Sequence, residues 1–313
     1  MMPTIGELEE QIRDLINHSR RNSELRQDAG LFSQLCSSLD VIGDTDLALR
    51  DYLESEQLSP SQGMRYLLSY GVLQALVLQQ DAVQHLAESL GVAYHAPKEL
   101  LEIRDVRNNS VGHPTKRGPA PSRAFNHISR ATMSWKGFDL LTFRSSGGPE
   151  MESIDLPGLI ETQRRLLAAA LLGIAEAERS REQDHRRRYR SDRLMAVFGT
   201  GFDYAFQKLR EELQGDRSPR TSMATVILVR EAIERLRGLL ADRGELPALQ
   251  EHFDYHAAPA LHSLERLQSF VENGPTDQLA LADADNHWFR LRHELDDLRA
   301  LTQEIDEEYQ RDP

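Results

Sequence analysis

The residues best suited to chemistry lie together in the stretch RDVRNNSVGHPTKRG, residues 104–118. Arg107 offers a planar guanidinium that can bind two phosphate oxygens at once, and His113 offers an imidazole that transfers protons near neutral pH. Asn108 follows the arginine directly and could orient either group. These residue types predict half of a site that cleaves a phosphodiester of RNA.

The spacing from Arg107 to His113 is weak support by itself, because arginine is very common in this chain. Four of the 37 basic residues are lysines, so 33 are arginines, and about 3 arginine–histidine pairs with four to six intervening residues are expected by chance. Two other pairs do share the spacing, Arg13–His18 and Arg179–His185.

The context of the 107–113 pair is more specific than its spacing. A helix is expected to begin at Pro97, to carry its apolar side chains over residues 100–106, and to end at Gly112 and Pro114. The histidine between these two residues is therefore forced out of the helical hydrogen-bonding pattern.

The elements that must position this stretch are mostly helices. A capping box of Thr4 and Glu7 begins a helix over 4–18, and shorter helical stretches are expected near 31–39 and 45–56. Ser59 as N-cap, followed by Pro60, predicts a long amphipathic helix that ends at Gly91.

The second half of this region mixes strands with one more helix. The segments FNHISRATMS and FDLLTFRS predict a β-hairpin near 124–144, and MESIDL is a possible third strand. A helix that begins near residue 155 runs into the arginine-rich segment 179–193, and we place a domain boundary near residue 180. Further helices are expected near 202–214, 218–242, 246–272 and 278–310.

A helical domain in which one helix ends in arginine, a polar residue and then histidine resembles the HEPN superfamily, whose hallmark is R-x(4–6)-H. The resemblance covers residues 1–180, with the hairpin as an insertion, and residues 181–313 form a second, all-helical domain of unknown role. It implies a metal-independent endoribonuclease that leaves 2′,3′-cyclic phosphate and 5′-hydroxyl ends. It also implies a homodimer in which two motifs, each with Arg107, Asn108 and His113, face one cleft.

The resemblance implies roles such as toxin, antiviral defence effector or RNA-processing enzyme, with a protein antitoxin or regulator as a further partner. The alternative is a non-catalytic helical scaffold of HEPN type that acts through residues 181–313. In that case Arg107 stabilises the helix C-terminus, and the Gly-His-Pro sequence is a stop signal.

A second cluster of basic residues lies in RSREQDHRRRYRSDR, residues 179–193. The residues expected to bind the RNA backbone are Arg186, Arg187, Arg188, Arg190 and Lys116. The simpler interpretation of this segment is a solvated helix of mixed charge that joins two domains.

No cofactor or metal ion is expected. His252 and His256 are one helical turn apart and could hold zinc with Glu251, Asp254 or His262, but no known zinc motif surrounds them. A metal-dependent hydrolase is thus the weakest of the three hypotheses.

The net charge of −13 over 313 residues disfavours a general nucleic-acid binder, so any RNA site must be a local basic patch. The chain shows no export signal and no apolar run that could span a membrane, and Cys36 is its single cysteine. These features predict a cytoplasmic protein without a membrane partner.

Overall fold

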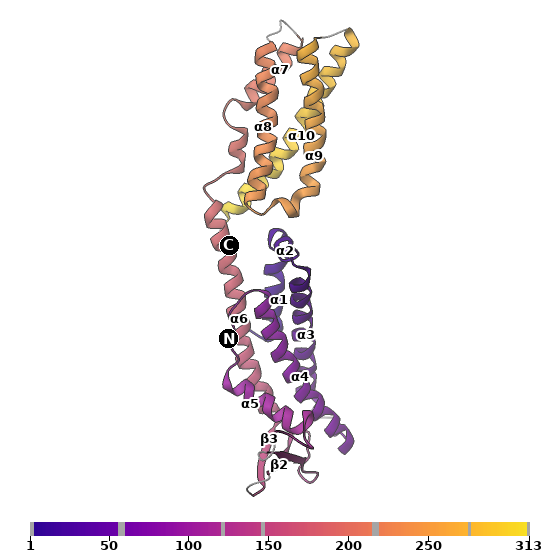
Figure 1. Cartoon of the computed structure of the whole chain (residues 1–313), viewed down its shortest axis with the longest axis vertical. Coiled ribbons are helices and arrows are strands. Elements are labelled where there is room, and N and C mark those ends of the chain that lie inside the picture. Colours follow the sequence, from indigo (N-terminus) through magenta and orange to yellow (C-terminus); the bar gives the residue numbers. More distant parts are fainter. Residues whose placement is uncertain are drawn as a thin grey trace. The chain divides into compact units, whose positions relative to one another are not determined.

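The computed structural model describes residues 3–55, 60–119, 123–144, 148–214, 219–274 and 277–311. It is mainly α-helical with one small antiparallel sheet, which confirms the predicted fold class (Figure 1). The chain divides into two compact units, Met1–His18 with Leu25–Arg179, and Ser19–Glu24 with Ser180–Pro313. No helix in the described ranges has an apolar stretch sufficient to cross a bilayer.

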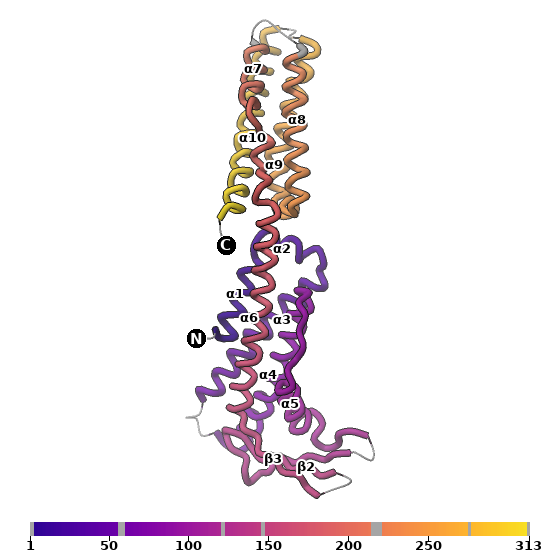
Figure 2. The backbone as a smooth tube through the Cα atoms, turned by 90° about the vertical axis from the view of Figure 1, so that its left-hand side faces the viewer, coloured from indigo at the N-terminus to yellow at the C-terminus, as the bar shows by residue number. Residues whose placement is uncertain are grey.

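The first unit is built on helices α1 (Ile5–Asn17), α3 (Ala29–Glu54), α4 (Gln62–Ser89), α5 (Lys98–Arg107) and the first part of α6 (Leu156–Tyr189). Helices α1, α3, α4 and α6 run alongside one another, and α5 lies with the sheet at one end of them (Figures 1 and 2). Their apolar faces form one core, in which Leu8, Leu39, Leu76 and Leu171 are fully buried.

The helix starts agree only partly with the sequence signals. The Thr4–Glu7 capping box is confirmed. Helix α4 is capped by Ser61, whose Oγ accepts from the N–H of Met64 at 3.4 Å, and Ser59, the expected cap, lies outside the described residues. The two helical stretches expected near 31–39 and 45–56 are one continuous helix, α3, because Gly43 between them keeps its helical conformation.

The sheet has the strand order β1 (Ala124–Ile128), β2 (Gly137–Arg144) and β3 (Glu150–Asp155), so the possible third strand is present. Asn126 is opposite Thr142, and Leu140 is opposite Glu152. Strand β2 must begin with glycine, because a Cβ on Gly137 would lie 1.8 Å from the carbonyl oxygen of Ile154. One face of the sheet, with Phe138 and Leu140, is buried in the core of the unit.

The second unit comprises most of α2 (Ser19–Leu25), the end of α6, a 3₁₀ turn η3 (Leu194–Phe198), and helices α7 (Phe202–Gln214), α8 (Pro219–Asp242), α9 (Leu246–Asn273) and α10 (Gln278–Gln310). Helices α7 to α10 lie side by side in both views (Figures 1 and 2). Their core contains Phe253 and the stacked pair Phe206–Trp288, whose ring centroids are 5.0 Å apart.

Candidate functional site

The stretch with Arg107 and His113 ends α5 in a single π-helical turn, η2 (Asn108–Gly112). The turn closes where the backbone N–H of His113 donates to the carbonyl oxygen of Asn108 at 2.8 Å. Such i→i+5 turns are rare and are frequently found at functional sites. The sequence predicted a helix end at this place, but not the wider turn.

The Arg107 guanidinium is half-buried and is held by two neutral amides. Its Nε and Nη2 donate to Oε1 of Gln74 on α4 at 3.1 and 2.7 Å, and its Nη1 donates to Oδ1 of Asn108 at 2.9 Å. No carboxylate in the described part of the chain pairs with it. The amides therefore fix the orientation of the guanidinium and leave its positive charge available to an anion.

Gly112 allows the guanidinium to lie against the π turn. A Cβ at this position would be 2.9 Å from Arg107 Nη1 and 3.4 Å from Asn108 Oδ1. Side chains larger than hydrogen would displace this pair, so the sequence Arg-Asn-x-x-x-Gly forms one packed unit. From the sequence, Gly112 is recognisable only as the end of a helix.

His113 follows the π turn, and its side chain is exposed. Within the described ranges its imidazole makes no hydrogen bond or ion pair, and no contact joins it to the Arg107 guanidinium. The Lys116 ammonium is also exposed and has no ion pair among those residues. The structure thus brings Arg107 and Asn108 together and places His113 at the open end of the same turn.

The two other arginine–histidine pairs with this spacing have different surroundings. Arg13 pairs with Glu9 and, at 2.7 Å, with Asp40, so carboxylates already compensate its charge. Arg179 donates to Gln11, but His185 is hydrogen-bonded to the Tyr309 hydroxyl at 2.8 Å. The 107–113 pair differs because its arginine is oriented by amides alone and its histidine is open to solvent.

A pocket of about 520 Å³ lies beside the π turn, and we call it the turn-side pocket. Strand β1 closes it on one side, since the N–H of Asn126 donates to the carbonyl of Pro114 at 2.7 Å. The lining residues are Gln62, Gly63, Tyr66, Tyr70, Ser110, Pro114, Asn126, His127, Ile128 and Arg130.

Two lining residues of the turn-side pocket have buried polar atoms that find no hydrogen-bond partner among the described residues, the Ser110 Oγ and the Asn126 Nδ2. Ser110 is 2% exposed and Asn126 is 5% exposed. The sequence analysis missed both residues. One signal was present, because Asn126 is a polar residue at an inward position of an alternating strand.

The arginine-rich end of α6 is largely engaged in contacts within the second unit. Arg186 donates to Glu182 at 2.7 Å and to Glu308 at 3.3 Å. Arg190 donates to the carbonyl of Gln310 at 3.2 Å. The exposed Arg187 guanidinium pairs with Asp184.

Arg188 is exposed and has no ion pair in the described ranges. Arg188 and Lys116 are the two members of the expected RNA-binding set for which the described residues provide neither an ion pair nor a side-chain hydrogen bond.

His185, on the same helix, is held uncharged in the fold. Burial, and next the nearby charge of Arg20, lowers the pKa of His185 to about 4. The Tyr309 hydroxyl donates to Glu245 at 2.6 Å, so the imidazole must donate to the Tyr309 oxygen. A neutral imidazole with its proton on Nε2 satisfies this geometry.

The second unit should therefore lose stability as the pH falls from about 6.5 to 4. In this range His185 binds a proton in the unfolded chain but stays neutral in the folded chain. The loss should be roughly 2–3 kcal/mol. It can be measured from urea unfolding in a Trp135→Phe background, where Trp288 is the single tryptophan and lies in the second unit. His185→Gln should remove most of this loss, and an unchanged pH dependence in that variant would contradict the assignment.

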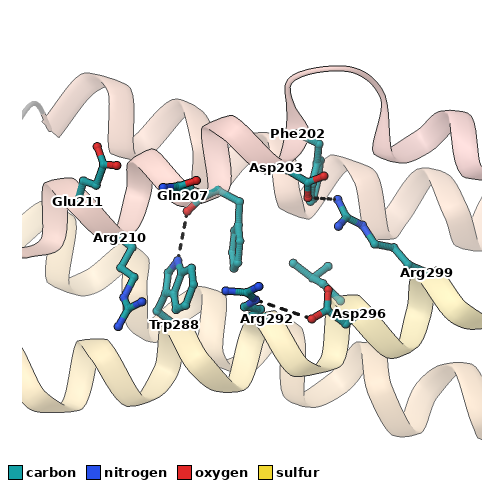
Figure 3. Close-up of a pocket in the computed structure, with 11 residues that line it drawn as sticks. Phe202, Asp203, Gln207, Arg210, Glu211, Trp288, Arg292, Asp296 and Arg299 are labelled. Atoms are coloured by element: carbon teal, nitrogen blue, oxygen red, sulfur yellow. Dashed lines mark hydrogen bonds and ion pairs between the residues drawn. The ribbon is translucent and has the colours of Figure 1, made fainter.

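The second unit has a pocket of about 560 Å³ between α7 and α10 (Figure 3). Its guanidiniums lie near aromatic rings, with Arg210 4.7 Å from the centre of Trp288. Each guanidinium also faces a carboxylate; the pairs are Arg299–Asp203 at 2.6 Å, Arg292–Asp296 at 3.8 Å and Arg210–Asp285 at 3.5 Å. Carboxylates of the protein therefore already compensate the positive charges of these three guanidiniums.

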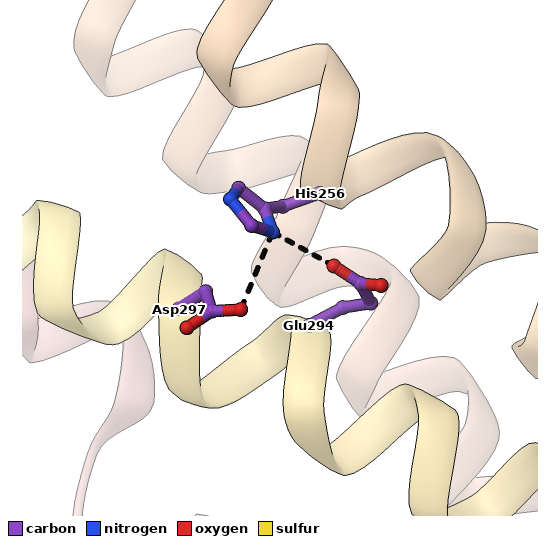
Figure 4. Close-up of side chains that lie close together, drawn as sticks. All are labelled: His256, Glu294 and Asp297. Atoms are coloured by element: carbon purple, nitrogen blue, oxygen red, sulfur yellow. Dashed lines mark hydrogen bonds and ion pairs between the residues drawn. The ribbon is translucent and has the colours of Figure 1, made fainter.

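The candidate zinc ligand His256 has other neighbours than those expected from the sequence. His256 does not join Glu251, Asp254 or His262, but lies with Glu294 and Asp297 of α10, at 2.7 and 3.5 Å from its Nδ1 (Figure 4). The Glu294 carboxylate also pairs with Arg290. Both oxygens of Glu294 thus have protein partners, and the cluster is a hydrogen-bonded ion-pair network across α9 and α10.

Comparison of this chain with family models, curated proteins and solved structures finds no match. The function must be inferred from the residues and geometry of the chain itself.

Proposed function

We propose that this chain is a metal-independent endoribonuclease of the HEPN type, which cleaves RNA at a site assembled from two copies of the chain. The observation that carries the proposal is the Arg107 guanidinium, which Gln74 and Asn108 orient without a carboxylate partner among the described residues, in a turn that ends at the exposed His113. This arrangement suits a phosphodiester, because the arginine can bind non-bridging oxygens while the histidine moves a proton.

The reaction requires two proton transfers. A neutral His113 takes the proton from the 2′-hydroxyl, and the freed oxygen attacks phosphorus. The bond from phosphorus to the 5′-oxygen then breaks, and that oxygen takes a proton from a second, protonated imidazole. The products are a 2′,3′-cyclic phosphate and a 5′-hydroxyl. The entering 2′-oxygen and the leaving 5′-oxygen lie on opposite sides of the phosphorus, so one imidazole does not reach both, and His113 of the partner subunit supplies the second group.

The surface next to Arg107 supports association with a second copy. Leu67 and Leu78 are exposed apolar side chains on α4, and they share one face with Gln74, which lies seven residues after Leu67 and four before Leu78. Exposed apolar stripes of this kind mark association surfaces. A dimer through this stripe would place two Gln74–Arg107 pairs near its two-fold axis.

The test is incubation of the purified protein with mixed RNA in EDTA, followed by analysis of the product ends. Cyclic phosphates are expected, and sedimentation should show a dimer. A dimer that leaves RNA intact would favour the alternative, a non-catalytic HEPN-type scaffold that acts through its C-terminal unit. Cleavage that EDTA abolishes would contradict the metal-independent mechanism.

Gly112→Ala should lower cleavage by about 10- to 100-fold, because the new methyl group displaces the guanidinium from its position on the π turn. The fold should survive, since the clashing atom is the mobile end of a side chain. Gly43→Ala is the matched control, because a Cβ there meets nothing within 4 Å. Equal cleavage by the two variants would show that the packing of Arg107 on Gly112 has no role in the reaction.

A further inference from the structure

We infer that the turn-side pocket holds one unpaired base of the RNA strand, an inference that rests on the proposed RNA cleavage. Ser110 and Pro114 belong both to the pocket lining and to the stretch that carries Arg107 and His113. A base in the pocket would therefore be close to the phosphate at the cleavage site. The pocket would set where the strand is cut.

The two unpartnered polar groups are the main support. A buried polar atom without a hydrogen bond is costly, and most such atoms in folded proteins are paired. Ser110 and Asn126 come from different elements, the π turn and β1, yet both line the same pocket and both have an unpaired atom. A ligand that forms hydrogen bonds with both groups would remove the free-energy cost of leaving them unpaired in the free protein.

The chemistry of the two groups matches the edge of a nucleobase. The Asn126 side-chain oxygen accepts from the Thr142 hydroxyl at 2.8 Å, so the free amide nitrogen is a donor. The Ser110 hydroxyl can donate or accept. Nucleobases present acceptors and donors side by side on their Watson–Crick edges, and single-stranded bases are recognised through these edges.

The remaining walls suit a flat ring attached to a phosphate chain. Tyr66 and Tyr70 on α4 form an edge-to-face pair with centroids 6.1 Å apart, and Tyr70 is exposed. Bases stack on such aromatic side chains. Arg130 and His127 are exposed on the rim, and none of the residues that line this pocket is acidic. The volume of about 520 Å³ is sufficient for one base.

A base inside a duplex cannot enter such a pocket, because its edge is paired and its faces are stacked. The inference therefore commits to single-stranded RNA. Fluorescence anisotropy with a labelled oligonucleotide of about ten unpaired nucleotides tests it in a His113→Ala background, which prevents cutting. The oligonucleotide should bind more tightly than the same sequence in a duplex.

Ser110→Ala is the decisive variant. It should weaken binding of the single strand by about tenfold, which corresponds to one lost hydrogen bond. Its unfolding temperature should not fall, because the deleted hydroxyl has no partner in the free protein. Ser89→Ala is the matched control, since that buried hydroxyl bonds the Leu86 carbonyl at 2.9 Å and is not part of the pocket.

Equal affinity of Ser110→Ala and the control for the single strand would overturn the inference, as would failure of the oligonucleotide to bind. These outcomes are separable from failure of the proposed nuclease site. If cleavage depends on His113 while Ser110→Ala binds normally, only the base pocket is wrong. If Ser110→Ala weakens binding while His113→Ala still cuts, the base pocket stands and the assignment of His113 fails.

Discussion

RNA cleavage should fall by about 10²–10⁴-fold when His113 is replaced by alanine, because the two copies of this imidazole in the dimer act as the base and the acid. Arg107→Ala should cost about 10²–10³-fold, since the charge that develops on the phosphorane-like transition state loses its guanidinium. Arg107→Lys should recover little of this loss. A lysine ammonium lacks the planar arrangement of N–H groups through which Gln74 and Asn108 orient the guanidinium. Initial rates on a defined RNA measure all three variants.

Two controls separate these losses from damage to the fold. His95→Ala removes another exposed histidine of the same unit, and Arg104→Ala removes the arginine one turn earlier on α5, which pairs with Asp81 at 2.6 Å. Both should cleave RNA at the normal rate. Full activity in His113→Ala, or equal losses in His113→Ala and His95→Ala, would reject the site.

Mixing experiments test whether the site really needs two copies. If both imidazoles of a dimer are essential, only dimers of two wild-type chains are active. An equimolar mixture of wild-type and His113→Ala chains, allowed to exchange, should then have about a quarter of the activity of wild-type protein at the same total concentration. A site complete within one chain would retain half. Activity of about half would contradict the composite site while leaving the roles of the residues intact.

The largest effect on stability is expected from Asp306→Ala in the second unit. The Asp306 carboxylate accepts from the backbone N–H groups of Leu194 and Met195, each at 2.9 Å, and lies 3.5 Å from Arg243. The Arg243 side chain is only 2% exposed. Removal of the carboxylate leaves a buried guanidinium without this counter-charge and two N–H groups without this acceptor, which should cost about 3–5 kcal/mol.

Urea unfolding in the Trp135→Phe background, with Trp288 as reporter, measures this loss. Asp296→Ala is the matched control on the same helix, because its carboxylate is exposed and lies 3.8 Å from Arg292. That change should stay within about 0.5 kcal/mol. A loss below about 1 kcal/mol for Asp306→Ala would show that the buried guanidinium does not depend on this carboxylate.

Local signals in the sequence were sufficient for much of the fold. The capping box at Thr4 and Glu7, the helix stop at Gly91 and the alternation of the hairpin segments all involve residues a few positions apart. Such interactions are encoded within one turn or one strand pair, so a pattern reveals them. The cap of α4 was missed because the sequence offers two serines of equal capping ability, Ser59 and Ser61, and the continuity of α3 was missed because glycine occurs inside helices as well as at their ends.

The candidate site depended on contacts that no local pattern contains. Gln74 and Arg107 are 33 positions apart, and Ser110 and Asn126 meet at one pocket only because the chain after the π turn pairs with β1. The motif could be selected from the sequence, but not the amides that orient its arginine. The arginine-rich segment is a second example, because Arg186 and Arg190 have partners near the C-terminus that composition could not reveal.

The π-helical geometry of residues 108–112 also sets the direction in which the histidine leaves the helix. Each residue of an α-helix rotates the chain by about 100° around the axis, and a π turn adds one residue to the turn before His113. Deletion of a single residue from this turn would let the histidine N–H bond the Asn108 carbonyl across an ordinary α-helical turn, with the direction of the imidazole largely kept. Deletion of a residue from α5, by contrast, would rotate the whole motif by roughly 100° around the helix axis. The wide turn therefore absorbs one residue of length, and a change of length before it is more disruptive to the site than a change within it.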